Sequence, residues 1–87
     1  MTFEDAFLSR EHRYSLGVEL TSGLHYAAIP VSNQMVDYVE HYELSDEEYH
    51  GFLHDPDSAL KFIESCRNRA EDRRLFLQPG SDRGTPR

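Results

Sequence analysis

The chain has 87 residues, 38% of them hydrophobic, one cysteine and a formal net charge of −7. That length fits one small domain, and a single cysteine excludes an internal disulfide. The negative charge disfavours direct nucleic-acid binding, because phosphates repel it, and no apolar run approaches the roughly 18 residues of a membrane span.

The first predicted element is a short helix over Thr2–Ser9, because Phe3 and Phe7 stand four residues apart and Thr2 is a suitable cap. At Tyr14 the period changes to two. Apolar side chains then alternate with small or polar ones, which predicts a half-buried strand. Its apolar positions are Tyr14, Leu16, Val18 and Leu20.

Two more predicted strands follow, each after a turn signal. The run from Leu24 to Val31 follows Gly23, and the run from Met35 to Glu43 follows a polar turn at residues 32–34. Pro30 cannot donate a ladder hydrogen bond, so we expect its strand to end there or to lie at a sheet edge. Short connections in succession predict an antiparallel meander.

Two helices are predicted after the strands. Ser45 and Glu48 form a capping box that begins the first, and Pro56 begins the second, which runs to about Asn68. A later apolar run at residues 75–77 predicts a returning fourth strand. The side chains at core spacing on the two helices are Tyr49, Phe52, Leu53, Ala59, Leu60, Phe62, Ile63 and Cys66.

These elements predict one α+β domain over residues 1–80: an antiparallel three- to four-stranded β-meander followed by two helices packed on one sheet face. Residues 81–87 are polar, contain Gly and Pro, and are predicted to form a disordered tail. The N-terminus lacks a basic stretch followed by an apolar one, so we expect no signal peptide and a cytoplasmic protein.

The charges are distributed very unevenly along the chain. Between Tyr14 and Leu60 there are nine Asp or Glu residues and no Lys or Arg, whereas residues 61–87 carry seven Lys or Arg against four acids. A solvated surface does not require so long a stretch of one sign. The acidic middle segment is therefore interpreted as functional.

No arrangement of side chains predicts catalysis. His50 and His54 are spaced i, i+4 with Asp46 one turn earlier, and two histidines with a carboxylate can bind a divalent metal. Gly51 stands where a zinc protease places its catalytic Glu, and a solvated helix face is the favoured interpretation. Cys66 falls at core spacing. We therefore predict neither an enzyme nor a bound metal or cofactor.

The most distinctive stretch mixes tyrosines with acids. Tyrosine is enriched at interface hot spots, and charge complementarity steers association, so this stretch predicts an interface for a basic protein. The predicted partner-binding residues are Asp37, Tyr38, Glu40, Tyr42, Glu43, Asp46, Glu47 and Glu48.

Several segments resemble those of small immunity proteins of contact-dependent inhibition and other polymorphic toxin systems. They are I-P-V-S-N, V-D-Y-V-E-H-Y and S-D-E-E-Y within Tyr26 to Tyr49, and the helix from Ala59 to Arg69 that ends in C-R-N-R. The resemblance implies a small, acidic, cytoplasmic bacterial protein that neutralises a cognate toxin, often a basic nuclease. It does not account for the basic segment from Lys61 onward.

Two alternatives stay open at the level of sequence. The first is a homo-oligomeric structural domain, assembled through a short sheet edge beside Pro30 or through contact of the acidic middle of one copy with the Arg67–Arg74 segment of another. The second is a metal-binding protein that uses His50 and His54. Within the favoured interpretation, the acids could also be spaced to imitate the phosphates of a nucleic acid.

Overall fold

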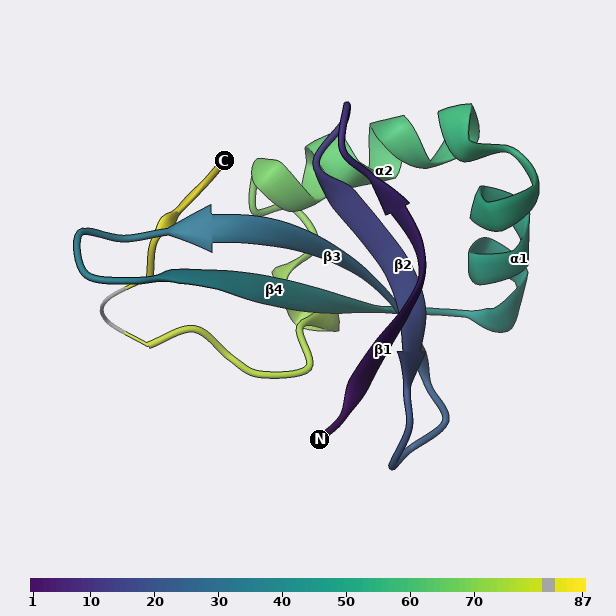
Figure 1. Cartoon of the computed structure of the whole chain (residues 1–87), viewed down its shortest axis with the longest axis horizontal. Coiled ribbons are helices and arrows are strands. Elements are labelled where there is room, and N and C mark those ends of the chain that lie inside the picture. The colour runs from purple at the N-terminus through teal and green to yellow at the C-terminus, as the bar shows by residue number, and fades with distance from the viewer. Residues whose placement is uncertain (81–82) are drawn as a thin grey trace.

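The computed structural model describes residues 1–80 and 83–87. Its sheet is antiparallel, with neighbouring strands in chain order (Figure 1). The strands are β1 (Phe3–Ser9), β2 (Tyr14–Glu19), β3 (His25–Ser32) and β4 (Asp37–Leu44).

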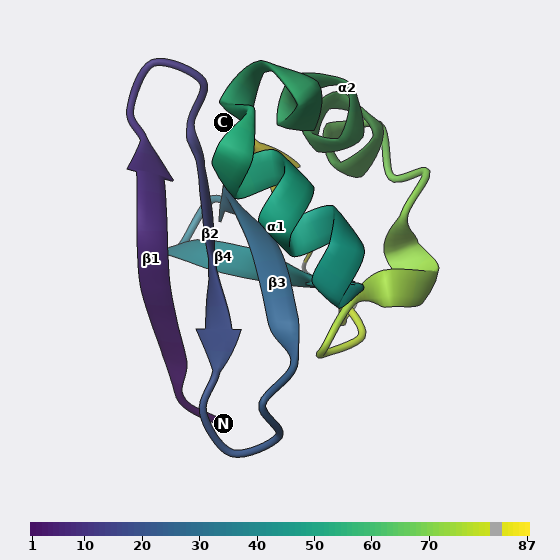
Figure 2. The ribbon, with the colours of Figure 1, turned by 90° about the vertical axis from the view of Figure 1, so that its right-hand side faces the viewer.

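Two helices follow the strands, α1 (Asp46–His54) and α2 (Pro56–Arg67), and both lie on one side of the sheet (Figure 2). A short 3-10 helix, η1 (Asp72–Arg74), and strand β5 (Thr85–Pro86), which pairs with β3, come after them. The predicted α+β class and the meander followed by two helices are confirmed.

The prediction of a helix over Thr2–Ser9 is wrong, because this segment forms strand β1. The register between β1 and β2 shifts between Asp5 and Phe7. On one side of this irregularity Phe3 lies away from the helices, and on the other side Phe7 lies opposite Leu16 and packs against the core. The four-residue spacing of the two phenylalanines therefore reflects a change of sheet face and not one face of a helix.

Strand β3 continues past Pro30 to Ser32, contrary to the prediction that it ends at the proline or lies at an edge. Pairing between β2 and β3 stops at the Ser15–Ala28 pair. The Pro30 carbonyl accepts a hydrogen bond from Arg87 N at 3.1 Å. The backbone nitrogen of the proline therefore faces the side where β2 has ended, and a missing N–H is tolerated there.

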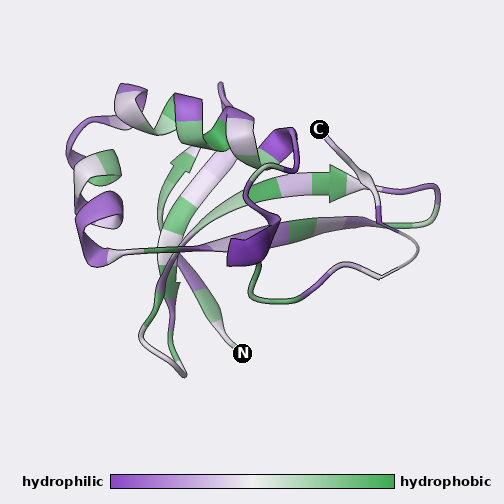
Figure 3. Cartoon of the chain, turned by 180° about the vertical axis from the view of Figure 1, so that it is seen from behind, coloured by the Kyte–Doolittle hydropathy of each residue, from purple (hydrophilic) through white to green (hydrophobic). Residues whose placement is uncertain are grey.

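The local signals for the helices are confirmed. In the capping box the Ser45 side chain accepts from Glu48 N, and the Glu48 side chain accepts from Ser45 N. The apolar helix residues pack against apolar side chains of the sheet. Hydrophobic segments of both layers are green in Figure 3. The buried side chains of this core include Tyr14, Leu16, Ala27, Ile29, Val31, Tyr42, Leu44, Tyr49, Ala59, Ile63 and Cys66.

The C-terminal segment differs from its prediction. Residues 75–77 form no strand. Instead, Leu75 makes a single bridge to Tyr42, and Phe76 N donates to the His41 carbonyl at 3.0 Å. The predicted disordered tail contains β5, which pairs with Val31 and Ser32 of β3. The first two residues of that tail, 81 and 82, lie outside the described residues.

Candidate functional site

Tyr42 is not on the surface where the sequence analysis placed it. Its side chain is completely buried in the core. Its hydroxyl lies 2.8 Å from Glu40 Oε1 and 3.3 Å from the Cys66 carbonyl, and it donates to these acceptors. Burial, and then the hydrogen bond with Glu40, raise the pKa of Tyr42 far above its usual range. This tyrosine supports the fold and presents no surface to a partner.

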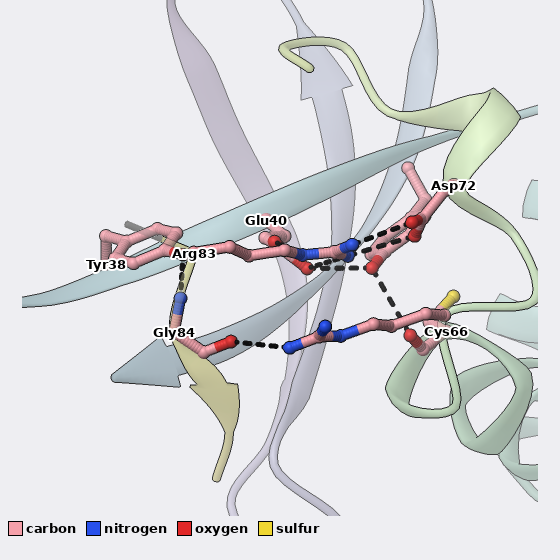
Figure 4. A network of polar contacts seen from close by, with 8 residues as sticks. Tyr38, Glu40, Cys66, Asp72, Arg83 and Gly84 are labelled. Atoms are coloured by element: carbon pink, nitrogen blue, oxygen red, sulfur yellow. Dashed lines mark hydrogen bonds and ion pairs between the residues drawn. The ribbon is translucent and has the colours of Figure 1, made fainter. Parts of the chain in front are cut away.

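Glu40 is also withdrawn from the surface, because Arg83 pairs with it (Figure 4). Arg83 donates from Nε and Nη2 to Glu40 at 2.8 and 3.1 Å, and from Nη1 and Nη2 to Asp72 at 2.7 and 2.9 Å. The Arg83 side chain is only 12% exposed and that of Glu40 only 6%. The hydrogen bonds that Asp72 accepts from Arg83 lower the pKa of the Asp72 carboxyl. We call the trio Glu40, Asp72 and Arg83 the C-terminal clamp.

Further contacts hold the chain beside this clamp. Gly84 N donates to the Tyr38 hydroxyl at 2.7 Å, and Arg69 Nη2 donates to the Gly84 carbonyl at 3.1 Å (Figure 4). Tyr38 is therefore half-buried, and its polar tip is occupied. At the start of β4, Asp37 accepts from the Ser32 hydroxyl at 2.7 Å and lies 3.4 Å from Arg87 Nη1.

Glu48 forms the second strong ion pair with the basic C-terminal half. Arg74 Nη1 and Nη2 donate to its two carboxylate oxygens at 2.9 and 3.1 Å, while Arg74 Nε donates to Glu71 at 2.9 Å. The Arg74 guanidinium also lies over the Phe62 ring, 4.9 Å from its centroid. These hydrogen bonds lower the pKa of Glu48. Its carboxylate is therefore committed to the capping box and to Arg74.

Five acids remain exposed around α1, and none of them is paired with a Lys or Arg among residues 1–80 and 83–87. Along the chain they run from the end of β4, through the first turn of α1, to the start of α2. The first turn of α1 is hydrophilic (Figure 3). Asp46 lies 3.2 Å from His25 Nε2, and its side chain is 86% exposed. We call this set the acidic end: Glu43, Asp46, Glu47, Asp55 and Asp57.

The histidine alternative gains no geometric support. His50 and His54 are exposed, and His50 makes edge contacts with the rings of His25 and Tyr49. In the part of the chain that the structure describes, no group of three or more His, Cys, Asp or Glu side chains could hold a metal ion. Cys66 is buried, and burial raises the pKa of its thiol to about 12, so it is not a ready nucleophile.

The sheet face opposite the helices carries a groove that sequence reasoning missed. Its volume is about 610 Å³, and side chains from all four long strands line it. It arises because the sheet coils strongly: Phe3 of β1 stacks on His41 of β4, with 3.6 Å between ring centroids, although two strands separate them. A helix was predicted at β1, so no sequence pattern indicated this face.

Comparison of the chain with protein-family models, with curated proteins and with solved structures found no match. Within the described residues, no helix has the length and apolar character needed to cross a membrane.

Proposed function

We propose that this protein is a small binding module that recognises a basic protein through the acidic end. The observation that carries the proposal is which acidic side chains are paired with arginines and which are not. Arg83 and Arg74 neutralise Glu40 and Glu48, whereas the acidic end keeps its carboxylates free of Lys and Arg within the described chain. Two arginines of the basic segment, which the resemblance to immunity proteins does not explain, therefore neutralise acids of the same molecule.

The acidic end is also held in a defined shape. The capping box fixes the start of α1, so the carboxylates of Asp46 and Glu47 project from a rigid first turn. Exposed acids on a rigid element keep their hydration until a partner arrives, and they attract a basic surface over about a Debye length, roughly 8 Å at physiological salt. Such an element suits fast, salt-sensitive recognition.

The narrower form of the proposal is toxin neutralisation, in which the basic partner is a toxin such as a nuclease. It rests on the small size, the net charge of −7 and the segments that resemble immunity proteins. Relative to the sequence prediction, Tyr42, Glu40 and Glu48 are no longer contact residues. Asp37 and Tyr38 lie at the opposite end of β4 from the acidic end and are not part of it.

Capture of partners from the native lysate at low and high salt tests the proposal, with three versions of the protein as bait. The acidic-end variant is Glu43→Gln/Glu47→Gln. The matched control, Glu4→Gln/Glu11→Gln, removes the same charge from exposed positions elsewhere. We expect wild type and control to retain one basic protein at low salt and the acidic-end variant to lose it. Equal retention by both variants would contradict the proposal.

Part of one of the two contacts considered for the homo-oligomer alternative is already used within a single copy. Arg67 donates to the backbone of the β1–β2 turn, and Arg74 is paired with Glu48, so these arginines already act within one copy. Light scattering at two salt concentrations checks this point. A mass near 10.1 kDa is the expected result, and a dimer at low salt would revive the alternative.

A further inference from the structure

The groove on the outer face of the sheet has apolar walls and a floor of small side chains. Ser15 and Ala28 form part of its floor on β2 and β3. Leu8 on β1 and Val39 on β4 line it, and they are 57% and 49% exposed. Because these are among the largest exposed hydrophobic side chains of the protein, a ligand with an apolar body would remove surface here that is costly to leave in water.

Three arginines line the same groove. Arg10 and Arg13 come from the turn between β1 and β2, and Arg87 comes from the residue after β5 (Figure 1). In the described chain, the side chains of Arg10 and Arg13 make no hydrogen bond or ion pair. Arg87 is 47% exposed and makes only a long contact, 3.4 Å, to Asp37. The guanidinium groups of Arg10 and Arg13, without partners in the described chain and beside an apolar groove, favour an anionic ligand.

The turn that carries Arg10 and Arg13 is held in place. Arg67 on α2 donates from Nη2 to the backbone carbonyls of His12 and Arg13, the latter at 3.2 Å. His12 N donates to the Ser9 hydroxyl at 3.2 Å. Arg13 adopts a left-handed backbone, with φ of 55°, where glycine would be the least strained residue. The backbone from which Arg10 and Arg13 project is therefore held by contacts from α2 and from Ser9.

The net charge of the whole molecule favours a small anionic ligand over a large one. At a net charge of −7, an acidic protein or a polyanion would be repelled as it approached. A small anion inside the groove interacts mainly with charges within about 8 Å, and more distant acids are screened. One carboxylate, Asp5, lines the groove as well, and it accepts the hydrogen bond of the Tyr26 hydroxyl. Three guanidinium groups outnumber it.

We propose that this groove binds a small organic anion with an apolar body, its carboxylate or phosphate lying against Arg10 and Arg13 and its body between Leu8 and Val39. The site lies on the sheet face opposite the helices and shares no residue with the acidic end. It is therefore independent of the proposed protein partner.

The test is an NMR titration of the intact, isotope-labelled protein with ligands that share one ring system and differ in charge. Naphthalene-2-carboxylate and 2-naphthyl phosphate are the anions, and naphthalene-2-carboxamide is the neutral analogue. We expect the anions to shift the amide signals of Leu8, Ser15 and Val39. The anion that binds with the lower Kd identifies the preferred head group. The neutral analogue should bind at least about tenfold more weakly, as expected when a charged contact is lost.

Variants locate the site. Arg13→Gly keeps the left-handed turn and Arg10→Gln keeps a polar side chain, so both should fold, which well-dispersed spectra would verify. Each should weaken anion binding several-fold, and the pair together by about tenfold or more. Lys61→Gln is the matched control, because it removes one exposed charge from α2 outside the groove. Val39→Asp introduces a negative charge into the wall and should abolish binding.

Three results would overturn the proposal. The first is equal binding of the anions and the amide, and the second is equal weakening by Lys61→Gln and by the arginine variants. The third is signal shifts confined to residues outside the groove, or no shifts at millimolar ligand.

Discussion

Glu19 is a buried carboxylate that holds the β2–β3 turn together. Its side chain accepts hydrogen bonds from Thr2 N at 2.8 Å, from Thr21 N at 2.9 Å and from Ser22 N at 2.8 Å, and the residue is 2% exposed. These backbone donors bind the ionised form, so they lower the pKa of Glu19 from 4.5 to about 2. One side chain thus links the N-terminus to the turn between two strands.

Glu19→Gln tests this linkage through pH. Because the folded pKa lies below the unfolded one, the stabilising effect is fully present above about pH 4.5 and is lost as pH falls through about 2. We expect wild type to be more stable than the variant at pH 7, with the difference shrinking towards pH 2. Urea unfolding at several pH values measures it. A difference that does not change with pH would mean that the carboxylate charge is unimportant.

Gly17 on β2 lies tightly against the backbone of β1 and against the ring of Tyr26. A Cβ atom there would collide with the Glu4 carbonyl oxygen and with the Tyr26 ring. We expect Gly17→Ala to destabilise the protein by about 1–3 kcal/mol, the usual cost of overpacking. Gly51 in α1 is the matched control, since nothing lies within 4 Å of a Cβ there.

At that helical position, Gly51→Ala should stabilise the protein by about 0.5–1 kcal/mol, because alanine is the better helix former. Denaturant midpoints measured on both variants check the prediction. It would be wrong if the two changes moved the midpoint in the same direction.

At the scale of elements, the C-terminal clamp attaches the chain end to β4. Arg83→Met would remove the guanidinium and leave Glu40 and Asp72 charged, with Glu40 almost fully buried. Loss of one partner of such a pair costs about 2 kcal/mol or more, since the remaining charge lacks compensation. We expect this loss in urea unfolding, together with faster hydrogen exchange in β5.

The double variant Glu40→Gln/Arg83→Met should recover part of the lost stability, because it removes the orphaned carboxylate as well. Additive losses would indicate that the two residues do not depend on each other.

The elements that were predictable are those with local signals. The Ser45–Glu48 capping box and Pro56 determined both helix starts from a few adjacent residues. Strand β1 was mispredicted because an irregularity after Asp5 changes the sheet face, which no periodic pattern reveals. Strand β5 was not predicted, because it follows Arg83, whose pairing with Glu40, 43 residues earlier in the chain, no local pattern indicates.

The candidate site was likewise predictable only in part, because the sequence gives the acidic residues but not their partners. Sequence composition correctly located an excess of acids, yet only the fold determines which of them are neutralised. The carboxylates of Glu40 and Glu48 pair with arginines from the C-terminal half, whereas those of Glu43 and Glu47 pair with none within the described residues. The groove could not be foreseen, because its walls come from four strands and it exists only once the sheet coils.

The whole molecule carries two surfaces of opposite charge. The acidic end runs from the end of β4 through α1 to the start of α2, and α1 and α2 lie on one side of the sheet (Figure 2). The arginine-lined groove lies on the opposite face of the sheet. The basic C-terminal half neutralises selected acids and so concentrates the remaining negative charge in one place. Steering by such a surface depends strongly on ionic strength.

The most direct test of this account is the association rate with the captured basic partner, measured across a range of ionic strengths. We predict that the wild-type rate falls steeply as salt rises and that Glu4→Gln/Glu11→Gln follows it. The Glu43→Gln/Glu47→Gln variant should associate about tenfold more slowly at low salt, with a shallower salt dependence. If the two variants instead showed the same rates and the same salt dependence, the acidic end would not be the recognition surface.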